Sequence, residues 1–181
     1  MTRAKCLIPV LTTLVIEITL ISLGVWQIER RSLKQAMIAR IETGLKAPPQ
    51  TLPDKSVWNT LPAHAIDYQK VRVNGRFLHE REAYLYMLYT PEEGREPTPG
   101  YAVITPFLLE TGGVVLVNRG YVPMSKLDPA SRAPAHPSDP VTVVGLLRPA
   151  EKRSWFSPDD QPAKQLFYTR DIAAISTGLG L

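Results

Sequence analysis

The chain has 181 residues, which is enough for one globular domain in addition to a membrane anchor. Its formal net charge is +4, but the basic residues are scattered, so no nucleic-acid partner is expected. The single cysteine, Cys6, excludes a disulfide or a cysteine-rich metal site within one chain. The 17 prolines argue against a mostly helical domain.

The first element in chain order is an apolar segment over residues 7–28. About 20 such residues, at 1.5 Å each, cover the hydrocarbon core of a bilayer. A cleaved signal peptide is the alternative. The apolar run is longer than the core of a signal peptide, and no small-residue cleavage site follows it. We therefore expect residues 1–28 to form an N-terminal tail and a retained transmembrane anchor in contact with lipid.

One acidic residue, Glu17, interrupts the anchor near its middle. A charged side chain at the bilayer centre costs about 2.5–3.5 kcal/mol on insertion scales, and often marks a functional site. The other interpretation is that Glu17 is protonated or hydrogen-bonds another helix. Ser22 and Gly24 are small enough to line such a helix contact, and Trp26 and Gln27 suit the membrane interface.

The segment 29–66 is expected to be an amphipathic helix followed by a connector. Apolar residues recur every four positions through residues 29–45, and Gly44 is a plausible stop signal. This stripe consists of Leu33, Met37, Ile41 and Leu45. Four prolines between residues 48 and 62 then predict an extended connector.

The remaining segment, 67–181, has the pattern of short β-strands without helices between them. The strands are predicted over residues 68–77, 83–88, 101–110, 114–122, 141–149 and 167–169. Residues 111–113 join two of them as a hairpin. The fold class is therefore mainly β: an N-terminal transmembrane helix followed by an antiparallel open barrel or sandwich domain.

Several residues within the strands carry finer predictions. Gly75 is expected at a bulge, and Pro106 in an edge or bulged strand. The stretch 114–117 is apolar on both faces, so its strand should be central or covered. The core is expected to include Val71, Val73, Val103, Phe107, Leu116, Val143 and Leu146. The proline-rich stretch 124–140 is long enough to be a functional or disordered loop.

Four blocks of sequence resemble the Surfeit locus protein 1 family of cytochrome oxidase assembly factors. They are LGVWQIERRSLKQAMI (23–38), YQKVRVNGRF (68–77), PGYAVITPFLLETGGVVLVNRGYVP (99–123) and GLLRPAEKRSWFSPDD (145–160). The resemblance covers residues 23 to about 175 in the family's order. The LG-x-WQ-x-x-R motif and the VNRG-aromatic-VP motif are specific as a pair.

The resemblance implies a non-enzymatic protein that assists insertion of haem a into subunit I of cytochrome c oxidase. The expected partners are subunit I and the haem a synthesis machinery. Family members lie in the mitochondrial inner membrane or the bacterial plasma membrane, with the domain on the outer side. A count of basic residues around the anchor favours the cytoplasmic side instead, and we follow the family. The lack of a transit-like segment before residue 7 favours the bacterial membrane.

The chain departs from the family pattern at its C-terminal end, Leu181. The family continues into a second transmembrane helix, where the histidine proposed as haem ligand lies. No residue here matches that histidine, so haem a binding is possible without a known ligand. The chain is expected to be either a fragment or a shortened member, and Glu17 could have its partner in the missing helix.

Two groups of residues are candidates for partner or haem contact. In the first, Asn118, Arg119 and Gly120 are expected at the end of a strand. Arg119 could bind a carboxylate, including a haem propionate, or could form an internal salt bridge beside a strained Gly120. In the second, Trp26, Gln27 and Arg30 lie at the predicted membrane interface, where they could anchor the helix or contact a partner.

Other residues are assigned no binding role. The three histidines, His64, His79 and His136, lack spaced partners, so no metal site is expected. Trp155 and Phe156 are interpreted as core or hairpin packing. No nucleophile–base pair, P-loop or paired carboxylate is evident, so no catalytic residues are predicted. The alternative function is a membrane-tethered β-domain that binds a protein or envelope ligand and has no haem role.

Overall fold

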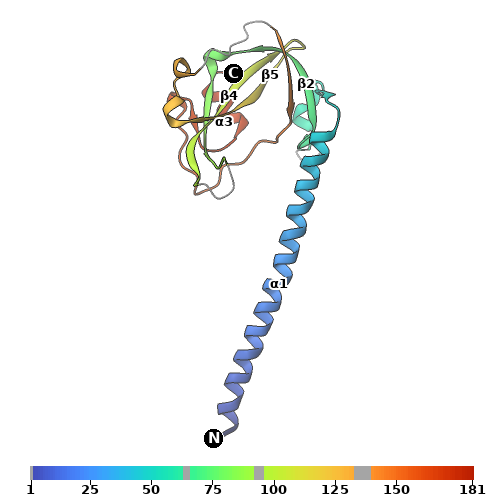
Figure 1. Cartoon of the computed structure of the whole chain (residues 1–181), viewed down its shortest axis with the longest axis vertical. Coiled ribbons are helices and arrows are strands. Elements are labelled where there is room, and N and C mark those ends of the chain that lie inside the picture. Colours follow the sequence, from blue (N-terminus) through green and yellow to red (C-terminus); the bar gives the residue numbers. More distant parts are fainter. Residues whose placement is uncertain (1, 63–65, 92–95, 133–139) are drawn as a thin grey trace. The chain divides into compact units, whose positions relative to one another are not determined.

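The computed structural model describes residues 2–62, 66–91, 96–132 and 140–181. The chain forms two compact units, residues 1–47 and residues 48–181 (Figure 1). The first unit is a single helix, and the second is a mostly β domain, here called the β domain. The predicted connector contains a short strand and a 3₁₀ helix, η1 (Lys55–Thr60), both within the second unit.

The helix α1 (Thr2–Lys46) has 45 residues and is continuous through the predicted anchor and the predicted amphipathic segment. Among the described residues, it is the one helix long and apolar enough to cross a membrane. The prediction of a helix over 29–45, continuous with the anchor, is confirmed. The helix ends just before Pro48, because a proline disfavours the helical conformation of the residue that precedes it.

The β domain contains a seven-stranded sheet that is not closed (Figure 1). Its strands are β1 (Gln50–Thr51), β2 (Lys70–Phe77), β3 (Ala83–Tyr89), β4 (Thr98–Leu109), β5 (Val114–Pro123), β6 (Val141–Leu146) and β7 (Leu166–Phe167). The order is β1-β2-β4-β3-β7, with β5 also paired to β4 and β6 also paired to β2. The predicted fold class is confirmed. Two short parallel pairs, β1 with β2 and β3 with β7, make the sheet mixed.

The longest strand, β4, is central to the sheet, so of the two alternatives predicted for the strand of Pro106 the edge strand is wrong. The pairing of β4 with β5 does contain a register shift, between Ala102 and Ile104. β5 runs along one side of β4, while β3 pairs with it up to Ile104 and β2 pairs with it from Phe107 onward. Pro106 lies at this change of partner, where its carbonyl oxygen accepts a hydrogen bond from the backbone N–H of Leu78 at 2.8 Å. Its missing N–H faces the same junction, so the proline removes no bond to a neighbouring strand.

Among the described residues, the apolar strand β5 pairs only with β4. Of the two alternatives predicted for residues 114–117, a central or a covered strand, the central position is therefore wrong. These four residues are half-buried, and they lie opposite residues 105–108 of β4. In the part of the chain that the structure describes, the strand β6 likewise pairs only with β2. The sheet therefore has open edges at β5 and β6 within the described part of the chain.

The glycine of β2, Gly75, continues the ladder without a register shift, so the predicted bulge is absent there. It pairs with Leu109 of β4 and with Val141 of β6. A side-chain Cβ at this position would lie 2.1 Å from the carbonyl oxygen of Leu108 and 2.8 Å from the ring of Phe107. Glycine is required here because β2 and β4 approach closely.

The main core cluster lies between the sheet and a short helix that the sequence patterns did not indicate, α3 (Ile172–Gly178). Asp171 caps this helix by accepting a hydrogen bond from the N–H of Ala174 at 3.1 Å. The buried residues of the cluster are Ala83, Ala102, Ile104, Phe167, Ile175 and Leu179. Of the predicted core, Val71, Val103 and Phe107 are buried, whereas Val73, Leu116, Val143 and Leu146 are only half-buried.

Candidate functional site

The predicted site residues Asn118, Arg119 and Gly120 form a β-bulge within β5. Ala102 pairs with Tyr121 and Ile104 with Asn118, so Arg119 and Gly120 together lie opposite a single residue of β4. Gly120 has φ of +111°, and its N–H donates to Oδ1 of Asn118 at 2.9 Å. The expectation that these residues end the strand is wrong, because β5 continues to Pro123.

The side chain of Arg119 pairs with a buried carboxylate that the sequence analysis did not single out. Glu82 is 3% exposed, and its Oε1 lies 3.4 Å from Nη1 of Arg119. A second guanidinium, that of Arg132, approaches Oε2 at 2.7 Å. The two arginine side chains are 23% and 17% exposed. Glu82 lies directly before β3, and it therefore joins the start of this strand to the bulge of β5 and to the segment after the 3₁₀ helix η4 (Pro129–Ser131).

Four further side chains complete this group, here called the Glu82 cluster. The hydroxyl groups of Tyr84 and Thr105 donate to Glu82 at 3.4 and 3.5 Å. Nη1 of Arg119 also donates to Nδ1 of His79 at 3.3 Å, so Nδ1 acts as the acceptor. The Arg119 guanidinium lies 5.1 Å from the centre of the Phe77 ring.

The chemistry of the Glu82 cluster is that of a structural ion pair. The carboxylate is shared between two guanidiniums, and hydrogen bonds from Tyr84 and Thr105 complete its surroundings. Glu82 and Arg119 correspond to the internal salt bridge that the sequence analysis weighed against a ligand contact. A contact of Arg119 with a partner or with haem stays a prediction.

Burial raises the pKa of Tyr84 above its usual value of 10.0, and the negative charge of Glu82 raises it further, while Arg132 opposes this. A raised folded-state pKa means that the protonated phenol stabilises the fold. This stabilisation is fully present below pH 10 and is lost as the pH rises through the folded-state pKa.

We therefore expect thermal melts of the full chain in mild detergent to show a loss of stability above pH 10 that is smaller in Tyr84→Phe. The measurement is the melting temperature between about pH 9 and 12, followed by circular dichroism, with the difference between variants isolating this one group. Tyr86→Phe, on the same strand and more exposed, is the control. Equal alkaline losses in wild type and Tyr84→Phe would contradict the prediction.

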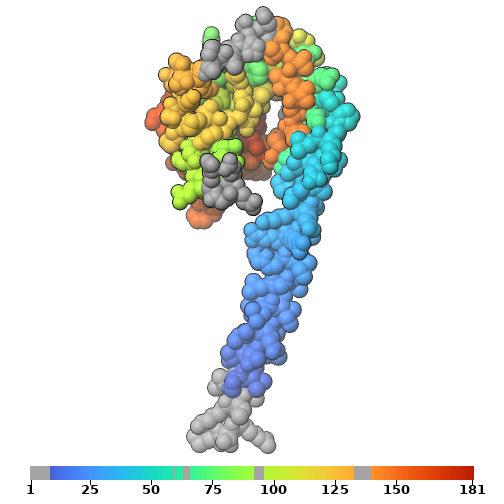
Figure 2. Space-filling model, viewed as in Figure 1, coloured from blue at the N-terminus to red at the C-terminus, as the bar shows by residue number. Residues whose placement is uncertain are grey.

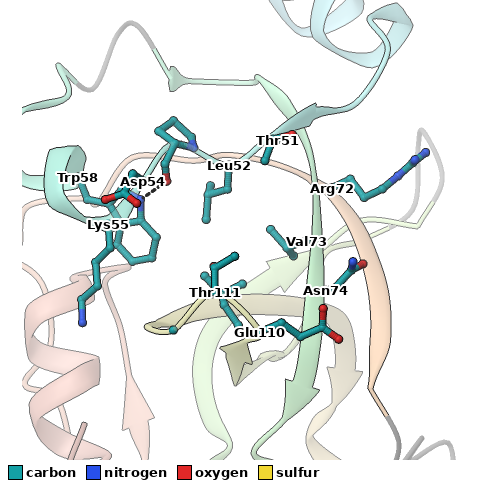
Figure 3. Close-up of a pocket in the computed structure, with 13 residues that line it drawn as sticks. Thr51, Leu52, Asp54, Lys55, Trp58, Arg72, Val73, Asn74, Glu110 and Thr111 are labelled. Atoms are coloured by element: carbon teal, nitrogen blue, oxygen red, sulfur yellow. Dashed lines mark hydrogen bonds between the residues drawn. The ribbon is translucent and has the colours of Figure 1, made fainter.

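A cavity of about 370 Å³ lies between the connector, β2 and the β4–β5 hairpin (Figure 3). Leu52, Val73 and Thr111 point into it, whereas the guanidinium of Arg72 points away (Figure 3). Trp58 is fixed at one side because its Nε1 donates to the carbonyl oxygen of Pro53 at 2.8 Å. The lining is mixed polar and apolar, and the volume lies within the range of about 300–1,000 Å³ that small-molecule sites have.

A second, smaller cavity of about 180 Å³ lies between the open edges of β5 and β6, where the surface is hollowed (Figure 2). Its lining is almost entirely aliphatic and shares Leu52 and Val73 with the larger cavity. The half-buried valines of β5 and β6 thus face this hollow, which explains why predicted core residues remain partly accessible.

Neither cavity offers a ligand for a haem iron. Among the described residues, the linings contain no histidine, cysteine, methionine or tyrosine. His79 lies in the 3₁₀ helix η2 (His79–Arg81) beside Arg119, while His64 and His136 fall outside the described residues. No group of three or more potential metal ligands occurs in the part of the chain that the structure describes. The linings of these two cavities therefore contain no axial ligand for a haem iron.

The candidate residues of α1 lie in the other unit of the chain. The Arg30 guanidinium lies 5.2 Å from the centre of the Trp26 ring, as their spacing of four residues predicts. Gln27 is exposed beside them on the helix. Glu17 is exposed on α1, and within the described chain its carboxylate has no hydrogen bond or ion pair. Partner contacts of these residues stay predictions.

The aromatic pair Trp155 and Phe156 does not pack into the core or a hairpin, so that prediction is wrong. Trp155 is 95% exposed and Phe156 is 73% exposed. Their rings contact each other edge to face, with centroids 5.6 Å apart.

The site residues that sequence reasoning missed are Glu82 and Arg132. Glu82 lies two positions after Glu80 in a polar stretch, and no local pattern distinguishes the two. Arg132 follows the 3₁₀ helix η4, which Asp128 caps by accepting from the N–H of Ala130 at 2.9 Å. The Asp-Pro pair at 128–129 was the available signal for an ordered turn in the predicted loop.

These features define a class of protein: an open, mostly β domain that follows a helix long enough to cross a membrane. The model of the SURF1 family matches residues 14–181, and the chain belongs to this family. The resemblance noted in the sequence is thereby confirmed.

Relatives from several organisms agree with this assignment. Surfeit locus protein 1 of Rattus norvegicus is 34% identical over 177 residues, which is 92% of this chain and 56% of the relative. The Homo sapiens protein is 32% identical over 174 residues, which is 90% of this chain and 57% of the relative. A SURF1-like protein of Monosiga brevicollis is 36% identical over 165 residues, which is 86% of this chain and 60% of the relative. The chain thus spans a little over half the length of the curated relatives it matches.

Proposed function

We propose that this chain is a membrane-anchored assembly factor for cytochrome c oxidase that assists insertion of haem a into subunit I. The observation that carries the proposal is the match to the SURF1 family over residues 14–181. The proposed partners are subunit I, the haem a synthesis machinery and membrane lipid, with no nucleic acid. The proposed action is to hold partners in place, not to catalyse a reaction.

The structure supports different roles for the two units. The apolar helix α1 is suited to hold the protein in the membrane where subunit I is assembled. The β domain offers two adjoining cavities, and their linings contain no axial ligand for iron. We therefore propose that the β domain binds a protein partner, and that haem a is cargo that other groups ligate.

The proposed location is the plasma membrane of a bacterium, with the β domain on the outer side, and the alternative is the mitochondrial inner membrane. This placement follows what the family resemblance implies. The count of basic residues around the anchor favours the opposite orientation, so a topology assay with a protease added from one side is the direct measurement.

The second candidate function is a tethered binding domain for a protein or envelope ligand, without a haem role. The cavity of about 370 Å³ favours it, because its volume lies within the range of about 300–1,000 Å³ that small-molecule sites have.

The test is a reduced-minus-oxidised absorbance spectrum of source membranes, with the gene deleted and then restored. We expect the haem a signal to fall on deletion and to return with the 181-residue chain. A signal that does not change on deletion would overturn the assembly role and leave the tethered binding domain. If the haem a signal returned only with a longer chain, the function would belong to the longer protein. The binding of purified subunit I to this 181-residue chain would then test whether the chain contributes partner binding.

A further inference from the structure

The aromatic residues Trp155 and Phe156 lie at the tip of a well-formed turn, here called the aromatic tip (residues 154–157). The N–H of Ser157 donates to the carbonyl oxygen of Ser154 at 3.1 Å, and the N–H of Ser154 donates to Oγ of Ser157 at 3.3 Å. The two aromatic residues thus occupy the central positions of a β-turn, which directs their side chains outward.

The base of the aromatic tip is held by an arginine. Nη2 of Arg153 donates to the carbonyl oxygen of Ser157 at 3.2 Å and pairs with the carboxylate of Asp159. The backbone at the tip is therefore fixed while its two large apolar side chains stay exposed. A fixed, exposed aromatic pair indicates a contact surface.

The charges around the aromatic tip are mostly paired. Glu151 pairs with Arg170 at 2.7 Å, and Oδ1 of Asp160 accepts from the N–H of Tyr168 at 2.8 Å. Lys152 has no ion pair among the described residues. The paired charges leave no excess of one sign around the aromatic tip. We therefore expect the aromatic tip to bind its partner surface mainly by inserting its apolar side chains, and less by charge attraction.

We propose that the aromatic tip inserts into the interfacial layer of the bilayer that α1 spans. This inference rests on the membrane-anchored part of the proposed function. Tryptophan side chains favour headgroup depth, where the ring is in an apolar layer and the indole N–H meets polar groups. A chain anchored in the bilayer also keeps its β domain close to that surface, at an effective concentration of order mM. Insertion holds the β domain at the membrane by a second contact.

The test uses the three tryptophans of the full chain, labelled as 5-fluorotryptophan, in phosphatidylcholine nanodiscs. Fluorine resonances of Trp155 and Trp26 are assigned by their loss in Trp155→Phe and Trp26→Phe. A spin label near the lipid headgroups should broaden the resonances of Trp26 and Trp155 and leave that of Trp58 sharp. The broadening of Trp155 should persist at about 1 M salt, where the Debye length is about 3 Å.

A matched pair of variants tests the role of the second ring. Phe156→Ser should reduce the broadening of Trp155 several-fold, whereas Leu88→Ser, at another exposed apolar position, should leave it unchanged. Neither side chain is buried, so both variants should fold.

The resonances of Trp26 and Trp155 separate the outcomes. Broadening of Trp26 without Trp155 would overturn the tip contact and leave the anchor in place. A sharp Trp26 resonance would overturn both the tip contact and the proposed membrane anchor, because α1 itself would not be in the bilayer. A Trp155 resonance insensitive to the lipid label and also to a water-soluble gadolinium chelate would be covered by protein, which overturns the lipid contact in favour of a protein partner.

Discussion

Replacing Glu82 with glutamine should lower the free energy of unfolding by about 2–3 kcal/mol. The substitution removes the charge shared by Arg119 and Arg132 and leaves two guanidiniums facing a neutral amide. Breaking a fully buried pair costs about 3–5 kcal/mol, but both arginines are partly exposed, so water screens part of the effect. The measurement is urea unfolding of the full chain in mild detergent, followed by near-ultraviolet circular dichroism.

The control for Glu82→Gln is Glu80→Gln, two residues earlier in the same stretch. Glu80 is exposed, so its substitution should change the free energy by no more than about 0.5 kcal/mol. If the two variants lost the same stability, the Glu82 cluster would not stabilise the fold as described. Arg119→Lys should give an intermediate loss, because lysine keeps the charge but not the planar guanidinium.

Replacing Gly75 with alanine should lower the free energy of unfolding by about 3 kcal/mol. The added methyl group would lie 2.1 Å from the carbonyl oxygen of Leu108, so β2 and β4 must move apart. The obstructing atom belongs to the backbone of a paired strand, which cannot adjust as a flexible side chain can. Urea unfolding under the same conditions measures the loss.

The control for Gly75→Ala is Gly145→Ala in the neighbouring strand β6. No atom lies within 4 Å of a Cβ built at Gly145, so alanine there should be neutral or stabilise by up to about 1 kcal/mol. Similar losses in both variants would mean that alanine is simply unfavourable in these strands, and would refute the close approach of β2 and β4.

The local parts of the fold were predictable from the sequence, and the long-range parts were not. Alternating side chains and the turn at 111–113 indicated the strands and the hairpin because these patterns depend on neighbouring residues. The pairing of β6 with β2, as between Thr142 and Asn74, joins residues that are distant in the chain. The helix α3 is too short to show a helical period, and its Asp171 cap was its only local signal.

The candidate site shows the same limit more sharply. The bulge at Asn118 and Gly120 combines two residue types suited to unusual backbone angles, so an irregular backbone at this position was predictable from the sequence. Nothing local indicates that Glu82 is buried and Glu80 exposed, because the tertiary fold decides this. Residue type led to a wrong prediction for Trp155 and Phe156. Large aromatic residues are usually buried, but these two are exposed.

The central position of β4 has a consequence for how the β domain loses its structure. One strand forms ladders with β2, β3 and β5, and β2 in turn carries β1 and β6. Removing β4 would separate β2, β3 and β5 from one another and leave β1–β2–β6 and β3–β7 as separate pieces. Neither piece keeps the main core cluster, because that cluster includes Ala102 and Ile104 of β4. The unfolding of the domain should therefore be a single cooperative transition without a stable half-folded state.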